Sequence, residues 1–305
     1  MVERTVIMRK QILGEFSIDR VVEYEGPFAA LQRIIPQITS EDVDANADWL
    51  KPLFLDDANN AIMSFHSYVL KTRRHTILID TCVGNNKPRP QRESWHLQNY
   101  DYLQAMARIG VRPDEIDFVC CTHLHADHVG WNTQLVNQQW VPTFSKARYV
   151  FAKTEYDHWE QAHRSALALN QPAPNHGSFA DSILPVVDAG QAMMVGDDFE
   201  FEKGVYLRAA RGHTPGNCIL HAHSQGAHAV FSGDILHTPA QLINLSWSSN
   251  FCYDAQASEQ SRKALVHSLA DSSSLLLAAH FPGPVAGHIV SQGDQFRFQG
   301  LKFGS

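Results

Sequence analysis

Three histidines and one aspartate lie within a six-residue segment, in the order His123, His125, Asp127 and His128. In extended backbone, residues two apart point to the same side, so His123 and His125 can hold one cation while Leu124 turns into the core. Asp127 and His128 then fall in the turn that follows and face a neighbouring point. Imidazole nitrogen and carboxylate oxygen bind zinc at about 2.0–2.2 Å and also suit manganese and ferrous iron. The spacing favours a metal site over an accidental surface cluster.

Three further residues of ligand type follow short apolar runs elsewhere in the chain: His213, Asp234 and His280. In α/β sheets, the crevice beyond the carboxyl ends of the strands is where ligands bind, because its loops are held by a rigid scaffold. Together with the first segment this makes seven candidate ligands, which is too many for one tetrahedral ion. Two ions about 3.5–4 Å apart, bridged by a carboxylate and a water, would use all seven.

The remaining histidines mostly lack such a context, and a lone histidine is usually a surface or hydrogen-bonded residue. We therefore expect no metal role for eleven of the seventeen, namely His66, His75, His96, His158, His163, His176, His221, His223, His228, His267 and His288.

The elements that must position the candidate ligands alternate between strands and helices. Extended segments are predicted over 15–22, 61–72 and 76–80, and short apolar runs at 118–121, 149–151, 205–207, 218–220, 229–231 and 275–279. Apolar residues have helical spacing over 97–110, 155–169 and 258–270. The segment 29–53 is predicted to form a helix and loops at one edge, or a cap over a site. This order predicts a layered α/β fold with sheets covered by helices.

Composition narrows the class of protein. The 305 residues carry a net charge of −7, the wrong sign for binding a polyphosphate backbone, so we expect no nucleic-acid partner. We also expect no membrane partner, because the chain lacks a long apolar run. The segment Met1–Lys10 lacks the apolar stretch of a signal peptide, and no run reaches the roughly 18 apolar residues of a membrane span. Five cysteines without a CxxC pair predict reduced thiols. We expect a soluble, cytoplasmic protein.

The segment His123–His128 resembles the HxHxDH motif of the metallo-β-lactamase superfamily, and 212–216 resembles its GHTPG motif. Ser232-Gly233-Asp234 and Ala279-His280 are similar to its last two ligand segments, so the resemblance covers roughly residues 62–284. It implies an αββα sandwich with two mixed β-sheets flanked by helices. The expected organisation is a single domain over 1–305, with 1–60 an N-terminal extension or cap packed on the core.

The resemblance also implies which residues hold which ion. One metal would lie on His123, His125 and His213, and the other on Asp127, His128 and His280, with Asp234 bridging the two. Two cations lower the pKa of bound water toward 7 and polarise the substrate, so a bridging hydroxide would be the nucleophile. Asp127 and Asp234 are the predicted catalytic carboxylates, and Asp127 would pass a proton to the leaving group.

Within the superfamily, Asp234 argues against a dedicated β-lactamase, because penicillin-opening members usually have Cys or no ligand at that position. The segments 81–85 and 129–133 look like the branch that contains methyl parathion hydrolase and N-acyl homoserine lactonases. The function implied is a dinuclear hydrolase of small esters or lactones with two divalent ions, Zn²⁺ first and Mn²⁺ or Fe²⁺ as alternatives. Phosphotriester or thioester hydrolysis, an iron-dependent redox role and a non-catalytic binding module remain as competing hypotheses.

Residues around the ligand segments are candidates for the substrate pocket. The five named are Trp131, His237, Trp247, Phe251 and Phe281, each with an alternative place in the core or next to a ligand. Cys252 is the only cysteine in a polar loop, and a catalytic thiol there would need a base. The expected partner is a small-molecule substrate, and the resemblance suggests a homodimer.

Overall fold

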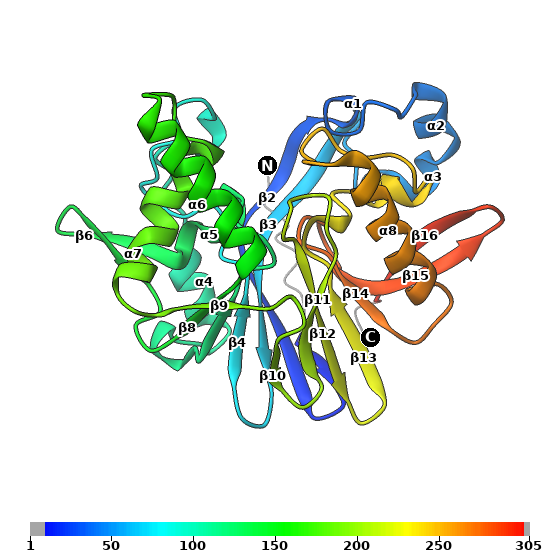
Figure 1. Ribbon diagram of the computed structural model, residues 1–305. Helices are drawn as coiled ribbons and strands as arrows, with labels where there is room; N and C mark the ends of the chain where they lie inside the picture. Colours follow the sequence, from blue (N-terminus) through cyan, green and yellow to red (C-terminus); the bar gives the residue numbers. More distant parts are fainter. Residues whose placement is uncertain (1–9, 302–305) are drawn as a thin grey trace. The chain divides into compact units, whose positions relative to one another are not determined.

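The structure is a computed structural model that describes residues 10–301, and the chain divides into two compact units. The central unit contains residues 15–24 and 65–199. The terminal unit contains, of the described residues, 10–14, 25–64 and 200–301. Two long strands, β2 (Phe16–Ala30) and β3 (Asn60–Lys71), have residues in both units. Figure 1 labels the elements in chain order.

The central unit is built on a parallel run of strands. β4 (Thr76–Ile79) pairs antiparallel with β3, and β4, β5 (Phe118–Cys120), β8 (Arg148–Ala152) and β9 (Ala192–Val195) then pair in parallel. They complete a seven-stranded sheet in the order β1-β2-β3-β4-β5-β8-β9, in which β1 is Gln11–Leu13. Parallel strands need crossover connections, and these carry the helices and loops described next.

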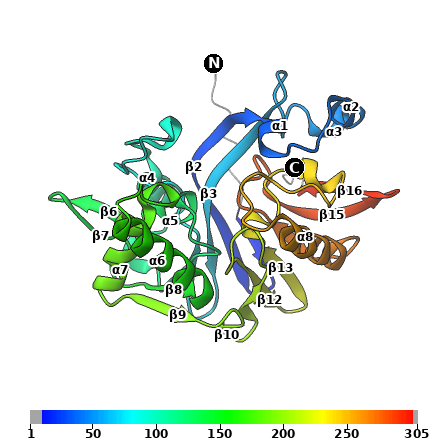
Figure 2. The same ribbon diagram turned by 45° about the horizontal axis from the view of Figure 1, so that its top comes forward.

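Helices of the central unit gather around β8 and β9, shown in green in Figure 2. They are α4 (Tyr102–Arg108), α5 (Ala126–Val129), α6 (Lys153–Ala168) and α7 (Leu184–Asp188). Short 3₁₀ helices are η1 (Glu93–Trp95), η2 (Pro113–Glu115), η3 (Gly130–Asn132) and η4 (Asn175–Gly177), and η5 (Phe179–Ile183) is a π-helix. A two-stranded hairpin, β6 (Thr133–Val136) and β7 (Gln139–Pro142), lies outside the main sheet. One apolar core joins sheet and helices, including Leu78, Val119, Tyr149, Met106 and Phe179.

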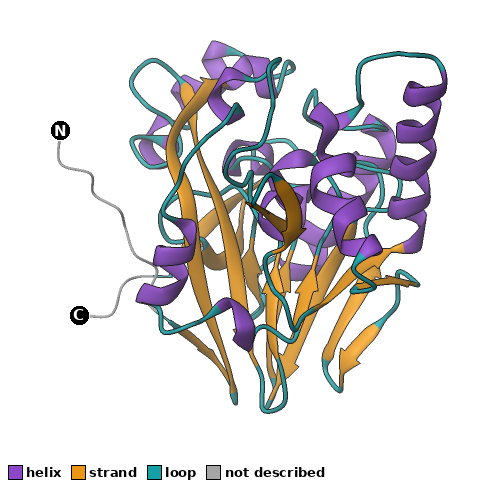
Figure 3. Cartoon of the chain, turned by 90° about the vertical axis from the view of Figure 1, so that its left-hand side faces the viewer, coloured by secondary structure: helices purple, strands orange, loops and turns teal. Residues whose placement is uncertain are grey.

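The terminal unit has its own seven-stranded sheet, whose strands follow chain order. These are β10 (Glu200–Glu202), β11 (Val205–Ala209), β12 (Cys218–Ser224), β13 (Ala227–Phe231), β14 (Leu275–Leu277), β15 (Ala286–Gln292) and β16 (Gln295–Gly300). Its pairs are antiparallel except β13–β14. The crossover between those two strands contains η6 (Gly233–Ile235), η7 (Pro239–Leu242) and α8 (Ala255–Leu269). Figure 3 distinguishes helices from strands by colour.

The 29–53 segment, predicted to be a helix and loops, contains three short helices, α1 (Leu31–Ile34), α2 (Ser40–Ala45) and α3 (Ala47–Leu50). The Thr39 hydroxyl accepts from the Asp42 amide, and the Asp42 carboxylate accepts from the Thr39 amide, so a capping box fixes the start of α2. Two large mixed sheets with flanking helices confirm the predicted α/β class. The expectation of one domain with residues 1–60 as an extension stays a prediction.

The helix predicted over 97–110 is shorter than expected, because α4 begins only at Tyr102. Leu97 has a positive φ of 50°, and the Asn86 amide donates to the Gln98 carbonyl at 2.9 Å. The Tyr100 amide donates to Asn85 Oδ1 at 2.7 Å. These contacts with a distant loop replace the first helical turn, whereas the predicted end before Gly110 is confirmed.

Among residues 10–301, no helix combines the length and apolar character that crossing a membrane requires. The predicted lack of a signal peptide concerns Met1–Lys10, of which residues 1–9 lie outside the described part of the chain.

Candidate metal centre

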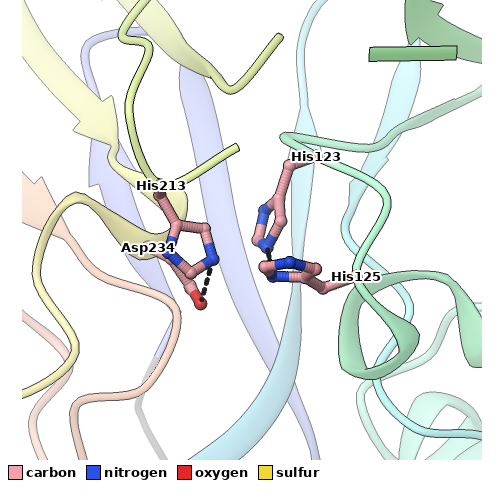
Figure 4. A group of neighbouring side chains, drawn as sticks. All are labelled: His123, His125, His213 and Asp234. Carbon is pink, nitrogen blue, oxygen red and sulfur yellow. Dashed lines mark hydrogen bonds and ion pairs between the residues drawn. The ribbon is translucent and has the colours of Figure 1, made fainter. Parts of the chain in front are cut away.

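The first candidate ligands lie in the loop between β5 and α5 of the central unit. His123 Nε2 is 3.1 Å from His125 Nδ1, so the two imidazoles face each other, as Figure 4 shows. The predicted common direction of these side chains is therefore found, although the backbone differs from the prediction. The strand ends at Cys120, and His125 occupies the position before α5, which contains Asp127 and His128.

A buried carboxylate fixes the orientation of this loop. Asp80 Oδ2 lies 2.9 Å from His128 Nδ1 and 2.8 Å from the Thr122 hydroxyl, and Oδ1 accepts from the Thr122 amide at 2.7 Å. Because His128 Nδ1 is occupied by Asp80, its Nε2 remains the nitrogen for a metal. Nε2 lies 3.9 Å from Asp127 Oδ2. Asp80 also has a positive φ of 55°.

Sequence reasoning missed Asp80, which it assigned only to the end of an extended segment. The available signal was positional. β4 pairs in parallel with β5, so residues that follow the two strands meet at the same sheet edge. An aspartate after one such strand is well placed to hydrogen-bond a histidine after the other.

The backbone of the ligand loop is held from its other side by two polar side chains. The Leu124 amide donates to Glu155 Oε1 at 3.0 Å, and the Ala126 amide donates to Asn175 Oδ1 at 3.0 Å. Asn175 Nδ2 returns a bond to the Leu124 carbonyl at 2.6 Å. The Leu124 side chain is buried in the core, as predicted. These contacts limit the freedom of the loop before any ion binds.

Glu23 supports the neighbouring loop at the end of β4. Its carboxylate accepts from the Val83 and Gly84 amides at 2.9 Å each and from Trp131 Nε1 at 2.7 Å. Burial raises the pKa of Glu23 to about 7, although these three donors act in the opposite direction. Gly130 makes close backbone packing possible here, since a Cβ at that position would lie 1.9 Å from the Val83 carbonyl oxygen.

In the terminal unit, the Asp234 carboxylate contacts both other candidate ligands, His213 and His280. Its Oδ2 lies 3.3 Å from His213 Nε2, a pair drawn in Figure 4, and its Oδ1 lies 3.2 Å from His280 Nε2. All three side chains are buried. A carboxylate that presents a different oxygen to each of two imidazoles has the arrangement that a bridging ligand needs.

The Nδ1 atoms of His213 and His280 also have partners. His280 Nδ1 lies 3.2 Å from the Ser64 carbonyl oxygen, which can only accept, so its Nε2 is left with a lone pair. His213 Nδ1 lies 3.8 Å from the Cys252 thiol, which also donates to Ser258 Oγ at 3.3 Å. Cys252 therefore lies beside a candidate ligand.

Glycine is required in the loop that carries His213. Gly212 has a φ of +124°, and a Cβ there would lie 2.0 Å from the Ser258 amide nitrogen in the first turn of α8. The Tyr253 amide donates to the His213 carbonyl at 2.9 Å, and the Asp254 amide donates to the Gly212 carbonyl at 2.9 Å. The loop is thus anchored to the start of the helix.

His237 lies in the same cluster, with Nε2 3.4 Å from Asp234 Oδ2 and 3.3 Å from Ser249 Oγ. The Phe251 ring lies 5.7 Å from the His237 ring and is 40% exposed. Trp247 is buried, and its carbonyl accepts from Gln241 Nε2 at 2.9 Å.

The two other aromatic candidates lie in packed surroundings. Trp131 is stacked on Tyr102, with ring centroids 5.0 Å apart, inside the core of the central unit. Phe281 is fully buried against Phe54 and Phe298. Substrate contact by any of the five pocket candidates stays a prediction.

The donors suit a metal ion by their chemistry. His123, His128, His213 and His280 each have Nδ1 next to a hydroxyl, carboxylate, thiol or carbonyl group and direct Nε2 at another candidate ligand. This arrangement, with one nitrogen held and the other presented, is typical of metal-binding histidines. Each unit by itself therefore presents imidazole and carboxylate donors that fit a divalent ion.

Comparison with known proteins gives a consistent result. The model of the family described as the metallo-beta-lactamase superfamily matches residues 66–280. The N-acyl homoserine lactonase AiiA of Bacillus thuringiensis subsp. kurstaki is 23% identical over 178 residues, covering 53% of this chain and 60% of the relative. The chain thus spans about 60% of the length of the curated relatives that it matches.

Solved structures with the same fold match nearly the whole chain. A hydrolase of the beta-lactamase superfamily, AbOPH, has a TM-score of 0.79 at 19% identity and covers 99% of this chain and 100% of its own. AidC, a dizinc quorum-quenching lactonase in complex with a product, has a TM-score of 0.78 at 20% identity, with the same coverage. These likenesses show a shared fold.

Proposed function

Because the chain belongs to the metallo-beta-lactamase superfamily, we propose that it is a metal-dependent hydrolase of small lactones or esters. The observation that carries the proposal is Asp234, which presents its two oxygens to two different histidines, at 3.3 and 3.2 Å. The matched family segment, residues 66–280, includes all seven candidate ligands.

The proposed centre holds two divalent ions. His123, His125 and His213 would hold one, Asp127, His128 and His280 the other, and Asp234 would bridge them. Zinc is the proposed metal, since imidazole and carboxylate are its common ligands and AidC is described as a dizinc enzyme. Bound there, the ions would supply Lewis acidity and lower the pKa of water near neutrality.

The residues of the chain have separate roles in this proposal. Asp80 and Ser64 orient the imidazoles of His128 and His280 through Nδ1, so that Nε2 faces inward. Asp127, the most exposed of the candidate carboxylates, can accept a proton from the attacking water and deliver it to the leaving alkoxide. His237, next to Asp234, is a candidate hydrogen-bond donor to substrate.

The substrate class is proposed from the relatives. The curated matches are N-acyl homoserine lactonases, and AidC holds an acyl homoserine product. Such substrates combine a neutral lactone ring with an apolar chain, and the Phe251 ring next to His237 offers a partly exposed apolar contact.

A substrate panel tests the proposal. Zinc-loaded and manganese-loaded protein, with a chelated control, is assayed on γ- and δ-lactones, aryl esters, thioesters, phosphotriesters and β-lactams. We expect turnover of lactones or esters that the chelator abolishes and added metal restores. Turnover confined to phosphotriesters or thioesters would reassign the substrate, and inert metal-loaded protein would refute hydrolysis.

A further inference from the structure

A second group of histidines lies in the terminal unit, apart from the seven candidate ligands. His221 and His223 are two residues apart on β12, and His223 is paired with His228 on β13. One ring nitrogen from each of the three lies within 4.8 Å of the others. The sequence alone predicts that all three are ordinary surface or hydrogen-bonded residues without a metal role.

The hairpin explains why these side chains meet. Gln225 and Gly226 both have positive φ, 50° and 81°, which is the backbone of a two-residue type I′ turn. Such a turn fixes the register, so that Ser224 pairs with Ala227 and His223 with His228. His223 also donates its amide to Gly204 in the strand connection on its other side, so the His223–His228 pair is of the non-hydrogen-bonded kind, with close side chains.

Strand alternation places His221 on the same face as His223, while Ala222 and Ser224 between and after them are buried. The rings of His223 and His228 lie 4.0 Å apart and are nearly parallel, at 7°. Because an imidazole lone pair lies in the plane of its ring, one of these two rings has to turn about its Cβ–Cγ bond for both to bind the same ion. His221 Nδ1 lies 3.0 Å from His228 Nε2. The face is open to water, with His223 exposed and His221 half-buried.

The nitrogen distance fits two ligands of one ion. Two nitrogens bound at about 2.0–2.1 Å lie roughly 2.9–3.4 Å apart, depending on whether the geometry is square-planar or tetrahedral. His228 Nδ1 lies 2.9 Å from Ser274 Oγ, so this histidine also has its outer nitrogen held. His223 Nε2 lies 3.1 Å from the Tyr206 hydroxyl, which adds an oxygen donor next to the group.

Electrostatics agrees with the geometry. Burial, followed by the neighbouring histidines and Arg208, lowers the pKa of His221 to about 4, and burial followed by His223 lowers the pKa of His228 to about 4. Both imidazoles are therefore neutral at pH 7 and keep a lone pair. Arg208, stacked over Tyr206 at 4.3 Å, is the nearby cation that would oppose binding.

We propose that His221, His223 and His228 form a second metal-binding site, for one divalent late transition ion such as Cu²⁺, Ni²⁺ or Zn²⁺. Imidazole is a preferred ligand of these ions, and Cu²⁺ binds most tightly in the usual series. All three ligands come from one hairpin of one unit, so the site does not depend on the proposed catalytic centre.

Copper binding to the full-length protein tests this site. The protein is first loaded with zinc to fill the proposed catalytic centre, and Cu²⁺ alone is then titrated while the electron paramagnetic resonance spectrum and the zinc released from the protein are both recorded, so that only copper bound without release of zinc is counted. We expect one further Cu²⁺ per chain, with hyperfine structure from imidazole nitrogens. A double variant, His223→Gln with His228→Gln, should bind that ion at least 100-fold more weakly.

The matched control is His267→Gln, which alters a histidine of α8 in the same unit but outside the group. It should bind copper as the unmodified protein does. Circular dichroism melting of all three proteins verifies that the hairpin variant is folded, since its changes lie on the water-facing side of the strands. Equal copper affinity in the double variant, or no copper bound beyond the zinc-filled centre, would overturn the proposal. The readout is a spectrum and stands whether or not hydrolysis is found.

Discussion

Replacing Asp80 with Asn is the most informative single change, because it alters one atom and reverses a hydrogen bond. Asp80 Oδ2 faces both His128 Nδ1 and the Thr122 hydroxyl, at 2.9 and 2.8 Å, while Oδ1 accepts from the Thr122 amide. In Asp80→Asn the side-chain oxygen can keep the amide bond, so the NH₂ group is turned toward His128. His128 must then accept through Nδ1 and carry its proton on Nε2.

A proton on Nε2 removes the lone pair that a metal needs. Changes of this kind, in groups that orient a ligand, typically lower metal affinity or activity 10- to 100-fold, which is about 1.4–2.7 kcal/mol. We expect Asp80→Asn to weaken binding of one of two zinc ions by that factor. Activity on the best substrate should fall in dilute zinc and recover when zinc is raised about 10- to 100-fold.

Zinc titration of metal-free protein, with the nitrogen-15 spectrum of the His128 ring, measures the effect. Asp117→Asn is the control, since Asp117 is another carboxylate of the central unit and accepts only from the Thr76 amide among its described side-chain hydrogen bonds, at 2.8 Å. The reasoning is refuted if Asp80→Asn binds both ions as the unmodified protein does, or if the His128 ring keeps its proton on Nδ1.

Two further predictions concern stability. The carboxylate of Asp181 binds the fully buried guanidinium of Arg89 at 2.6 and 2.9 Å. Asp181→Asn leaves this guanidinium without its counter-ion and should lower the free energy of unfolding, measured in urea, by about 3–5 kcal/mol. Asp157→Asn, which breaks an exposed pair with Lys153, should cost less than about 0.5 kcal/mol, and equal losses would contradict the argument. Burial raises the Glu23 pKa from 4.5 to about 7, so the folded state binds more protons than the unfolded state between these values. The free energy of unfolding should therefore fall by about 3 kcal/mol as the pH rises through that window. Thermal melts at several pH values should show a weaker dependence of stability on pH in Glu23→Gln, and an unchanged dependence would show that Glu23 is not its source.

Local spacing was enough to predict one part of the site. The His-x-His spacing of His123 and His125 predicted that the two imidazoles point to the same side. His123 Nε2 lies 3.1 Å from His125 Nδ1. Runs of apolar residues predicted the strands, because a strand that is buried on both faces consists of consecutive apolar residues. The starting position of α4 was wrong, since hydrogen bonds from 85–86 hold the residues before Tyr102.

Contacts between distant segments lay beyond sequence reasoning. Asp80 is 48 residues from His128, and the parallel pairing of β4 with β5 brings the two segments together. The grouping of the three hairpin histidines could not be predicted for a related reason. His221 and His223 form an alternating pattern that is typical of any water-facing strand, and their relation to His228 depends on the register set by the turn.

The account depends most on one claim, that the candidate ligands His123 and Asp234 both serve metal-dependent hydrolysis. The direct measurement is chelator-sensitive hydrolysis, on the best lactone or ester, by zinc-loaded unmodified protein, by His123→Ala and by Asp234→Ala. We predict that each variant loses at least about 100-fold in kcat/KM while remaining folded. Full activity in either variant, measured in protein that keeps its metal, would contradict the claim.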